Sequence, residues 1–221
     1  MGKPGYGLIE TMRVREGRIP FLSRHLARLE RSLNELDLAR PAHGLAALVT
    51  PFAATGDAVL RIEVRDGRAN VTGRALPPLA APALIAASVP HQPYRHKTTE
   101  RDCFVDAAAE AERAEADDAL LLTQDGLVAE GTVWNLFWWD DDMLRTPALD
   151  LGILPGIGRE RVLELVARVD QGRYARQQLA GKSLFLANAV RGVVPIASLD
   201  GSPTPADLRT AELAGRFWPA A

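Results

Sequence analysis

Residues 119–139 read ALLLTQDGLVAEGTVWNLFWW, a largely apolar stretch with an Asp-Gly pair near its middle. An apolar run at 119–123 predicts a buried strand. Asp125-Gly126 predicts a hairpin turn, because both residue types tolerate a positive φ. A second strand is expected over 127–133, and it leads into a further apolar run. The stretch therefore predicts a β-hairpin inside the protein.

Two polar residues, Glu130 and Asn135, interrupt the second half of that stretch. A carboxylate among apolar residues must be paired or exposed, because burying it alone costs several kcal/mol or more. One interpretation is a glutamate at a strand end that points to solvent. The other is a buried carboxylate that faces a bound cation. The stretch by itself leaves both open.

Composition limits the class of protein. The chain has 221 residues, 47% of them hydrophobic, which suffices for one large or two small domains with a real core. The net charge is −2 with acids and bases well mixed, so nothing favours nucleic acid or membrane as a partner. The single cysteine, Cys103, fits a reducing compartment. The N-terminus does not resemble a signal peptide and no apolar run reaches membrane-spanning length, so we expect a cytoplasmic protein.

A proline-rich segment, LPPLAAP at 76–82, predicts the boundary between two domains. We expect a small α+β domain over 1–80 and a larger α/β domain over 81–221. In the small domain, leucines at helical spacing predict an amphipathic helix over 22–36. Asp66-Gly67 predicts a second hairpin turn, between strands at 58–64 and 69–74. Its other faces carry charged side chains, among them Arg28, and most of these are expected in solvent.

In the larger domain, PHQPYRHK at 90–97 is broken by prolines and ends at Lys97. Thr98 or Thr99 is expected to cap a helix that runs to about residue 116. Further along, LPGIGRE at 154–160 runs straight into a helix. A glycine-rich turn that enters a helix presents free backbone N–H groups and the positive end of the helix dipole, which together can bind a phosphate. Alone, such glycines more often serve only the turn.

Three side chains each have an ordinary structural interpretation and a functional one. Lys97 is either a solvated lysine or a lysine of lowered pKa that forms a Schiff base. Arg28 is either a surface charge or a phosphate ligand, and Glu130 is either exposed or bound to a cation. A lysine, a carboxylate and a phosphate cup together suit pyridoxal 5′-phosphate (PLP): the lysine holds the aldehyde, and the carboxylate keeps the ring nitrogen protonated.

Other chemistries lack a motif. The four histidines are scattered without metal-ligand spacing, so no metal site is expected and each is interpreted as a surface or capping residue: His25, His43, His91 and His96. No nucleophile elbow, P-loop or dinucleotide fingerprint occurs.

With these features together, the chain resembles the fold-type IV, or class IV, PLP-dependent enzymes. This family includes branched-chain and D-amino acid aminotransferases and aminodeoxychorismate lyases. The resemblance runs from Gly7 to about Asp200. HLARL at 25–29 is similar to the family's H-x-x-R-L, whose arginine, here Arg28, binds phosphate. LVAEGTVWNLF at 127–137 matches E-x-x-x-x-N-L-F. Further segments match the phosphate-loop helix and the last cofactor segment, at 154–165 and 185–196.

The resemblance implies a site for PLP. Lys97 stands at the position of the Schiff-base lysine, and Glu130 takes the role opposite the pyridine nitrogen. It also implies a small α+β domain followed by a larger pseudo-barrel domain, and a homodimer. The implied cofactor-binding residues are Arg28, Lys97, Glu130, Asn135, Gly156, Ile157, Gly158, Asn188 and Ala189.

Three departures from the family pattern bear on function. The chain starts close to the first core strand, so the small domain is expected to be N-terminally shortened. Gly158 and Ala189 stand where phosphate-binding threonines are common, so backbone amides and Arg28 should carry more of the phosphate. Asp102 replaces a tyrosine often found five residues after the lysine, which weakens the branched-chain aminotransferase interpretation.

The leading hypothesis is an aminodeoxychorismate lyase that cleaves 4-amino-4-deoxychorismate, a small-molecule amino substrate, to 4-aminobenzoate and pyruvate. The alternative is an aminotransferase of the branched-chain or D-amino-acid type. A third possibility, a PLP carrier without activity, is disfavoured because a mere binder has no need of a carboxylate that makes the ring an electron sink.

Overall fold

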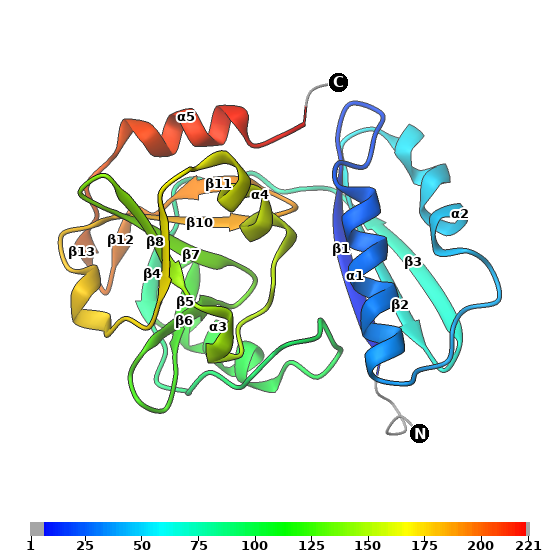
Figure 1. Ribbon diagram of the computed structural model, residues 1–221, viewed down its shortest axis with the longest axis horizontal. Helices are drawn as coiled ribbons and strands as arrows, with labels where there is room; N and C mark the ends of the chain where they lie inside the picture. The colour runs from blue at the N-terminus through cyan, green and yellow to red at the C-terminus, as the bar shows by residue number, and fades with distance from the viewer. Residues whose placement is uncertain (1–6, 220–221) are drawn as a thin grey trace. The chain divides into compact units, whose positions relative to one another are not determined.

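The computed structural model describes residues 7–219. The chain folds as two compact units (Figure 1). Unit 1 comprises the described residues up to Pro78 together with His96–Glu100, and unit 2 comprises Leu79–Arg95 and the described residues from Arg101 onward. The predicted N-terminal shortening concerns the chain before the first described strand and lies outside the described residues.

Unit 1 is a three-stranded antiparallel sheet with helices against it. Its strand order is β1-β2-β3, with β1 at Leu8–Val14, β2 at Ala58–Arg65 and β3 at Arg68–Arg74. Asp66 and Gly67 between β2 and β3 both have positive φ, of 49° and 71°, so this predicted hairpin turn is confirmed. Helix α1, Leu22–Glu35, lies along the sheet, followed by α2, Leu45–Val49, and the 3₁₀ helix η1, Thr50–Thr55 (Figure 1).

The core of unit 1 explains why α1 forms. Leu29 and Leu33 of the helix pack with Leu8 and Met12 of β1 and with Leu60 of β2, and each is at most 2% exposed. Alternate residues of a strand point to one face, so Leu8, Glu10 and Met12 all face α1. Glu10 thereby enters an otherwise apolar layer.

Unit 2 contains two five-stranded sheets. One has the order β11-β10-β7-β8-β9 and the other β13-β12-β4-β5-β6. The strands of the first are β7, Asn135–Asp140; β8, Met143–Pro147; β9, Val169–Gly172; β10, Ser183–Asn188; and β11, Gly192–Pro195. Those of the second are β4, Ala83–Ala86; β5, Asp118–Leu122; β6, Val128–Gly131; β12, Ser198–Leu199; and β13, Ser202–Pro203.

The helices of unit 2 are α3, Asp102–Arg113; α4, Ile157–Leu165; and α5, Leu208–Arg216, with the 3₁₀ helices η2, Leu149–Leu151, and η3, Arg176–Leu179. Helix α3 packs on β5, and α5 runs beside β11 (Figure 1). The mixed α/β architecture predicted for the chain is confirmed.

The predicted hairpin at 119–133 is present as β5 and β6, which pair in antiparallel fashion. Its turn differs in detail, because only Gly126 has a positive φ, of 76°. Thr123 closes the loop instead: its N–H donates to the Leu127 carbonyl at 2.8 Å, and its own carbonyl accepts from Gly126 at 2.9 Å. Beyond β6 the chain changes sheets, so Glu130 and Asn135 stand at the crossing point between the two sheets of unit 2.

The segment after Lys97 corrects one prediction. Thr98 and Thr99 do not cap a helix: α3 begins at Asp102 with Arg101 as its N-cap. Thr98 instead forms an antiparallel bridge with Leu8, and the Lys97 carbonyl accepts from the Ile9 N–H at 2.8 Å. β-Branched threonines favour extended backbone, and the exposed edge of β1 gives this segment its partner.

Candidate active site

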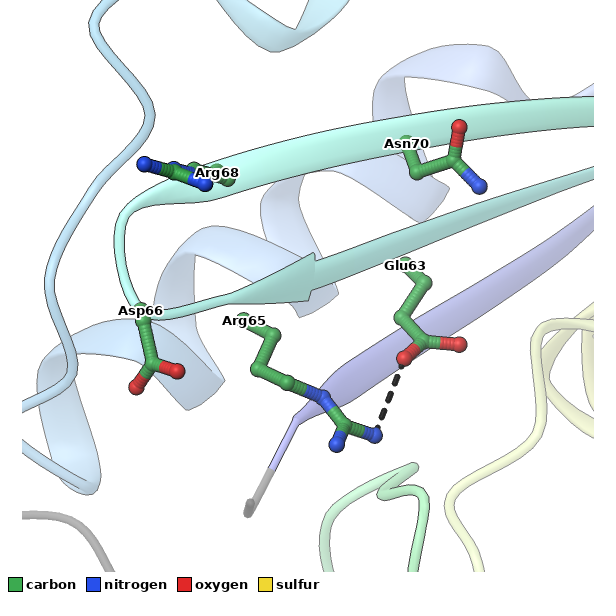
Figure 2. Close-up of a pocket in the computed structure, with 5 residues that line it drawn as sticks. All are labelled: Glu63, Arg65, Asp66, Arg68 and Asn70. Carbon is green, nitrogen blue, oxygen red and sulfur yellow. Dashed lines mark hydrogen bonds and ion pairs between the residues drawn. The ribbon is translucent and has the colours of Figure 1, made fainter. Parts of the chain in front are cut away.

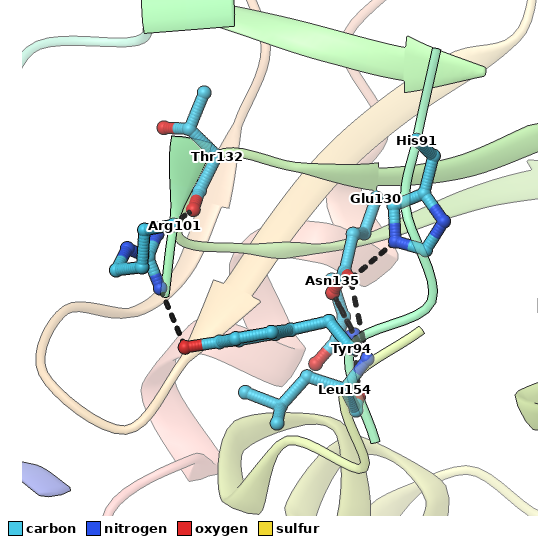
Figure 3. Close-up of polar contacts among 7 residues, drawn as sticks. All are labelled: His91, Tyr94, Arg101, Glu130, Thr132, Asn135 and Leu154. Carbon is cyan, nitrogen blue, oxygen red and sulfur yellow. Dashed lines mark hydrogen bonds and ion pairs between the residues drawn. The ribbon is translucent and has the colours of Figure 1, made fainter. Parts of the chain in front are cut away.

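In unit 2, the crossing point between the sheets holds Glu130 in a buried polar cluster (Figure 3). Glu130 is 3% exposed, so the interpretation as a solvent-facing strand end was wrong. Its Oε1 lies 3.0 Å from His91 Nε2, and the Leu154 N–H donates to both carboxylate oxygens, at 3.2 and 3.3 Å. Asn135 Nδ2 is 3.5 Å from Oε2 and also donates to the Leu154 carbonyl at 3.1 Å. The carboxylate is therefore fixed by three neighbours.

The glycine-rich turn lies against Asn135. Gly156 is the N-cap of α4, and a Cβ there would stand 2.1 Å from Asn135 Oδ1. That distance excludes any side chain without movement of Asn135. Ile157 and Gly158, both buried, form the first turn of the helix. The amides of this turn lack intrahelical acceptors by geometry, so they are the kind of donors that an anion requires.

The last predicted segment meets the same turn. A Cβ on Gly158 would lie 2.5 Å from the Asn188 Cα, so the two backbones are in direct contact. Asn188 Oδ1 accepts from the amides of Val190 and Arg191, at 2.9 and 2.8 Å, and so fixes the turn that follows β10. Ala189 is buried in that turn. Unit 2 thus brings together Glu130, Asn135, Gly156, Ile157, Gly158, Asn188 and Ala189.

Arg159 connects the first turn of α4 to the neighbouring strands β8 and β9. It is 2% exposed, and its Nη2 donates to Gln171 Oε1 at 2.7 Å and to the Pro147 carbonyl at 3.2 Å. Burial lowers the pKa of Arg159, while the negative charges of Glu160 and Glu130 oppose that shift. This cation holds the helix start against β8 and β9.

Unit 1 carries the other two predicted residues, Arg28 and Lys97. Arg28 is 7% exposed, so the interpretation as a surface charge was wrong. Its Nε donates to Glu10 Oε1 and its Nη2 to Glu10 Oε2, both at 2.7 Å. A two-armed pair of this kind is among the stronger hydrogen-bonded contacts in proteins. Lys97 is half-buried.

His25 completes the cluster around Arg28. It is fully buried, and its Nδ1 lies 2.8 Å from Glu10 Oε2. Burial opposes ionisation of Glu10, but the charge of Arg28 and the hydrogen bonds from His25 and Arg28 outweigh it and lower the pKa of Glu10 to about 2. Since the carboxylate can only accept, Nδ1 must be the protonated nitrogen of His25. Burial also lowers the pKa of His25 against the opposing hydrogen bond to Glu10, which favours the neutral ring.

Sequence reasoning missed Glu10, His25 and His91 as members of these clusters. The interpretation of His25 and His91 as surface or capping residues was wrong, since both are buried and paired with a carboxylate. Glu10 carried the same signal as Glu130, a carboxylate within an apolar strand. His91 had no such signal, because it lies 39 residues from its partner.

A hollow elsewhere in unit 1 is not part of either cluster. It lies on the β2–β3 hairpin and is lined by Glu63, Arg65, Asp66, Arg68 and Asn70 (Figure 2). Arg65 Nη2 donates to Glu63 Oε1 at 3.0 Å, so these two charges of the hollow are paired with each other. No residue predicted for the site lines it.

A second buried carboxyl group, Asp118, lies at the start of β5. Its Oδ1 accepts from Thr132 Oγ1 and from the Ala119 N–H at 2.8 Å, whereas Oδ2 has no hydrogen-bond partner among the described residues. Burial raises the pKa of Asp118 to about 6, against the opposing hydrogen bonds from Thr132 and Ala119 and the charge of Arg101. Ionising this group in the folded state therefore costs stability.

We expect the free energy of unfolding to carry a matching pH dependence. Because the folded pKa lies above the unfolded value of 3.8, the stability from protonated Asp118 is fully present below about pH 3.8 and is lost as the pH rises through about 6. The loss amounts to about 3 kcal/mol, at about 1.36 kcal/mol per pKa unit. Between pH 4.5 and 7.5, urea unfolding of wild type should show about 2 kcal/mol of this decline, because the unfolded carboxyl is already mostly ionised at pH 4.5. Asp118→Asn should lack this decline and exposed Asp106→Asn should keep it. An identical decline in all three proteins would contradict the assignment.

Three comparisons with known proteins bear on this arrangement. The family model described as amino-transferase class IV matches residues 7–199. The aminodeoxychorismate lyase of Bacillus subtilis is 25% identical over 89% of this chain and 78% of its own length. A putative amino-acid aminotransferase from Mesorhizobium loti has a TM-score of 0.79 and 32% identity, covering 87% of this chain and 99% of that one. The 4-amino-4-deoxychorismate lyase of Pseudomonas aeruginosa has a TM-score of 0.80 and 27% identity, covering 95% and 89%.

The family model covers most of the chain and includes every residue of both clusters. The fold agrees with that of the matched structures, and the relatives include lyases as well as aminotransferases. The chain therefore belongs to the class IV aminotransferase family, whose members are PLP-dependent enzymes.

Proposed function

We propose that this protein binds PLP and uses it as an aminodeoxychorismate lyase, converting 4-amino-4-deoxychorismate to 4-aminobenzoate and pyruvate. The observation that supports cofactor binding is the buried cluster of unit 2, in which a fixed carboxylate, Glu130, lies near a helix start with glycines at 156 and 158. These groups fit PLP: the carboxylate can accept from a protonated ring nitrogen, and the backbone amides can donate to a phosphate. The lyase assignment is supported by the relatives from Bacillus and Pseudomonas.

When bound, PLP supplies an electron-withdrawing ring that stabilises negative charge on the substrate. Each remaining task falls to a residue of this chain. Lys97 would hold the cofactor covalently and, once displaced by the substrate amine, move a proton. Glu130, held by the Leu154 N–H and by His91, would keep the ring nitrogen protonated. The amides at Ile157 and Gly158, the turn at Asn188 and Ala189, and Arg28 would hold the phosphate.

The second candidate is transamination between an amino acid and a 2-oxo acid. It is favoured by the identity of 32% with the Mesorhizobium protein. The lyase is preferred because the Bacillus enzyme matches over most of its length, and because Asp102 stands where the tyrosine of branched-chain aminotransferases is common.

Product analysis separates the two activities. The lyase should release pyruvate and 4-aminobenzoate in equal amounts from aminodeoxychorismate, with no 2-oxo acid added and PLP recovered after each cycle. An aminotransferase must instead convert PLP to pyridoxamine phosphate and stop without an acceptor. Spectral conversion to that form by glutamate, leucine or D-alanine, reversed by a 2-oxo acid, would overturn the lyase proposal.

Arg28→Ala should weaken PLP affinity more than it slows turnover at saturating PLP. A charge-assisted contact to phosphate contributes about 1.5–3 kcal/mol, so the dissociation constant should rise about 10- to 100-fold. Since Ala leaves Glu10 buried without its cation, Arg28→Lys serves as the variant that keeps the charge but not the two-armed pair. Exposed Arg31→Ala on the same helix is the control. Titration of apoenzyme with equal affinities in Arg28→Ala and wild type would refute the role.

We also propose a homodimer in the cytoplasm, acting in the supply of 4-aminobenzoate for folate synthesis. The proposal rests on the family resemblance and on the absence of any sign of nucleic acid or membrane binding in the sequence. Among the described residues, no helix combines the length and apolarity required to cross a bilayer. Light scattering after size exclusion should give twice the mass of 23.9 kDa, and a monomer would contradict the assembly.

A further inference from the structure

Lys97 lies on a short loop whose two ends both belong to unit 2. The chain leaves that unit after Arg95 and returns to it at Arg101. Within the loop, the Thr99 N–H donates to the Gly7 carbonyl at 2.9 Å and the Lys97 carbonyl accepts from Ile9 at 2.8 Å. The backbone around Lys97 is thus paired with β1 in extended conformation.

Arg101 connects the two ends of this loop through hydrogen bonds at its base (Figure 3). Its Nη1 donates to the Tyr94 hydroxyl at 2.9 Å, which joins the residues on either side of the loop. Its Nη2 donates to the Thr132 carbonyl at 2.6 Å. The guanidinium carbon lies 4.7 Å from the centre of the Phe104 ring and 5.4 Å from that of Tyr94, so both aromatic rings restrict it further.

The same few residues also fix the surroundings of Glu130. Thr132, which accepts from Arg101, follows Glu130 by two residues, and its hydroxyl donates to Asp118. On the other side, His91 contacts Glu130 at 3.0 Å and precedes Tyr94 by three residues, and the Tyr94 N–H donates to Gly152 at 2.6 Å. The segment at 91–94 is therefore held by Glu130 at one end and by Gly152, two residues before Leu154, at the other.

We propose that Arg101 is a positioning residue that closes the base of the loop carrying Lys97 and joins that base to the strand end beyond Glu130. The guanidinium of Arg101 holds its N–H groups in one rigid plane, so two of its nitrogens can donate to two acceptors at once. The single ammonium group of a lysine cannot reproduce this arrangement. The inference about catalysis rests on the proposed function, since Lys97 and Glu130 are its central residues. The inference about the loop itself does not.

The test compares Arg101→Met and Arg101→Lys with Arg113→Met, which changes an exposed arginine in the last turn of α3. In apoenzyme, amide hydrogen exchange should be about 10-fold faster at Thr99 in Arg101→Met, less so in Arg101→Lys, and unchanged in Arg113→Met. In holoenzyme, kcat should fall by about 10- to 100-fold, as expected for a small misplacement of reacting groups. KM and PLP affinity should stay within about twofold of wild type, because Arg101 is not proposed to contact either ligand.

Tyr94→Phe provides a second route to the same loop, because it removes only the hydroxyl that accepts from Nη1. It should accelerate exchange at Thr99 less than Arg101→Met does, and it decides the matter if the methionine variant does not fold. Wild-type exchange at Thr99 with unchanged kcat would overturn the proposal. Acceleration spread evenly over the chain would also overturn it, since that marks a global loss of stability. If wild-type protein takes up no PLP, the proposed function fails while exchange in the apoenzyme still decides the role of Arg101.

Discussion

Lys97→Ala should abolish both the visible absorption band of lysine-bound PLP and all measurable turnover, while the protein stays folded. The reason is that no other amine stands at the family's lysine position. The sequence holds three lysines: Lys3, Lys97 and Lys182. Lys182 is paired with Asp140 in unit 2, and Lys3 lies outside the described residues. The expected loss of activity is at least that of removing a covalent catalyst, about three or more powers of ten.

The measurement is an absorption spectrum after dialysis, followed by a turnover assay with added PLP. Lys182→Ala is the control and should keep both the band and the activity, since it loses only an ion pair near the surface. A band that persists in Lys97→Ala would move the anchor to Lys3 or Lys182 and would refute the assignment of Lys97.

Glu130→Gln should retain PLP but slow turnover by roughly two to four powers of ten, as expected for removal of a preorganised electrostatic stabiliser. The amide keeps the size of the side chain and can still accept from Leu154, so the fold should survive. It cannot stabilise a proton on the ring nitrogen by charge, and the bound ring then withdraws electrons poorly.

Steady-state kinetics at saturating PLP measure this effect, with PLP affinity determined separately. Glu112→Gln on α3, which is exposed, is the matched control and should behave as wild type. Turnover in Glu130→Gln equal to that of the control would show that the buried carboxylate serves only to hold His91 and Leu154 in place.

The sequence predicted those features that depend on neighbours close in the chain. Asp66-Gly67 predicted a hairpin from two residues alone, and the glycines at 156 and 158 marked the start of α4. Glu130 stood out because an ionised group within an apolar stretch requires a partner. The identity of that partner was not predictable, because His91 lies 39 residues away and nothing local distinguishes it.

Contacts between distant segments account for the errors. The threonines after Lys97 suit a helix cap as well as a strand, and only pairing with β1 decides between them: the Gly7 N–H donates to Thr99 Oγ1 over a separation of 92 residues. Likewise the charge of Arg28 suggested a side chain in solvent, although it lies on the same buried face of α1 as Leu29 and Ser32. It is buried because Glu10, from a strand 18 residues earlier, enters the apolar layer and pairs with it.

The contact between Gly158 and Asn188 has a consequence for engineering this enzyme. A Cβ at position 158 would stand 2.5 Å from one backbone atom of Asn188 and 2.6 Å from another, and backbone cannot rotate away as a side chain can. The threonine that related aminotransferases often carry at this position therefore cannot be grafted alone. A change of the proposed phosphate cup requires exchange of the 156–158 and 188–191 segments as one block.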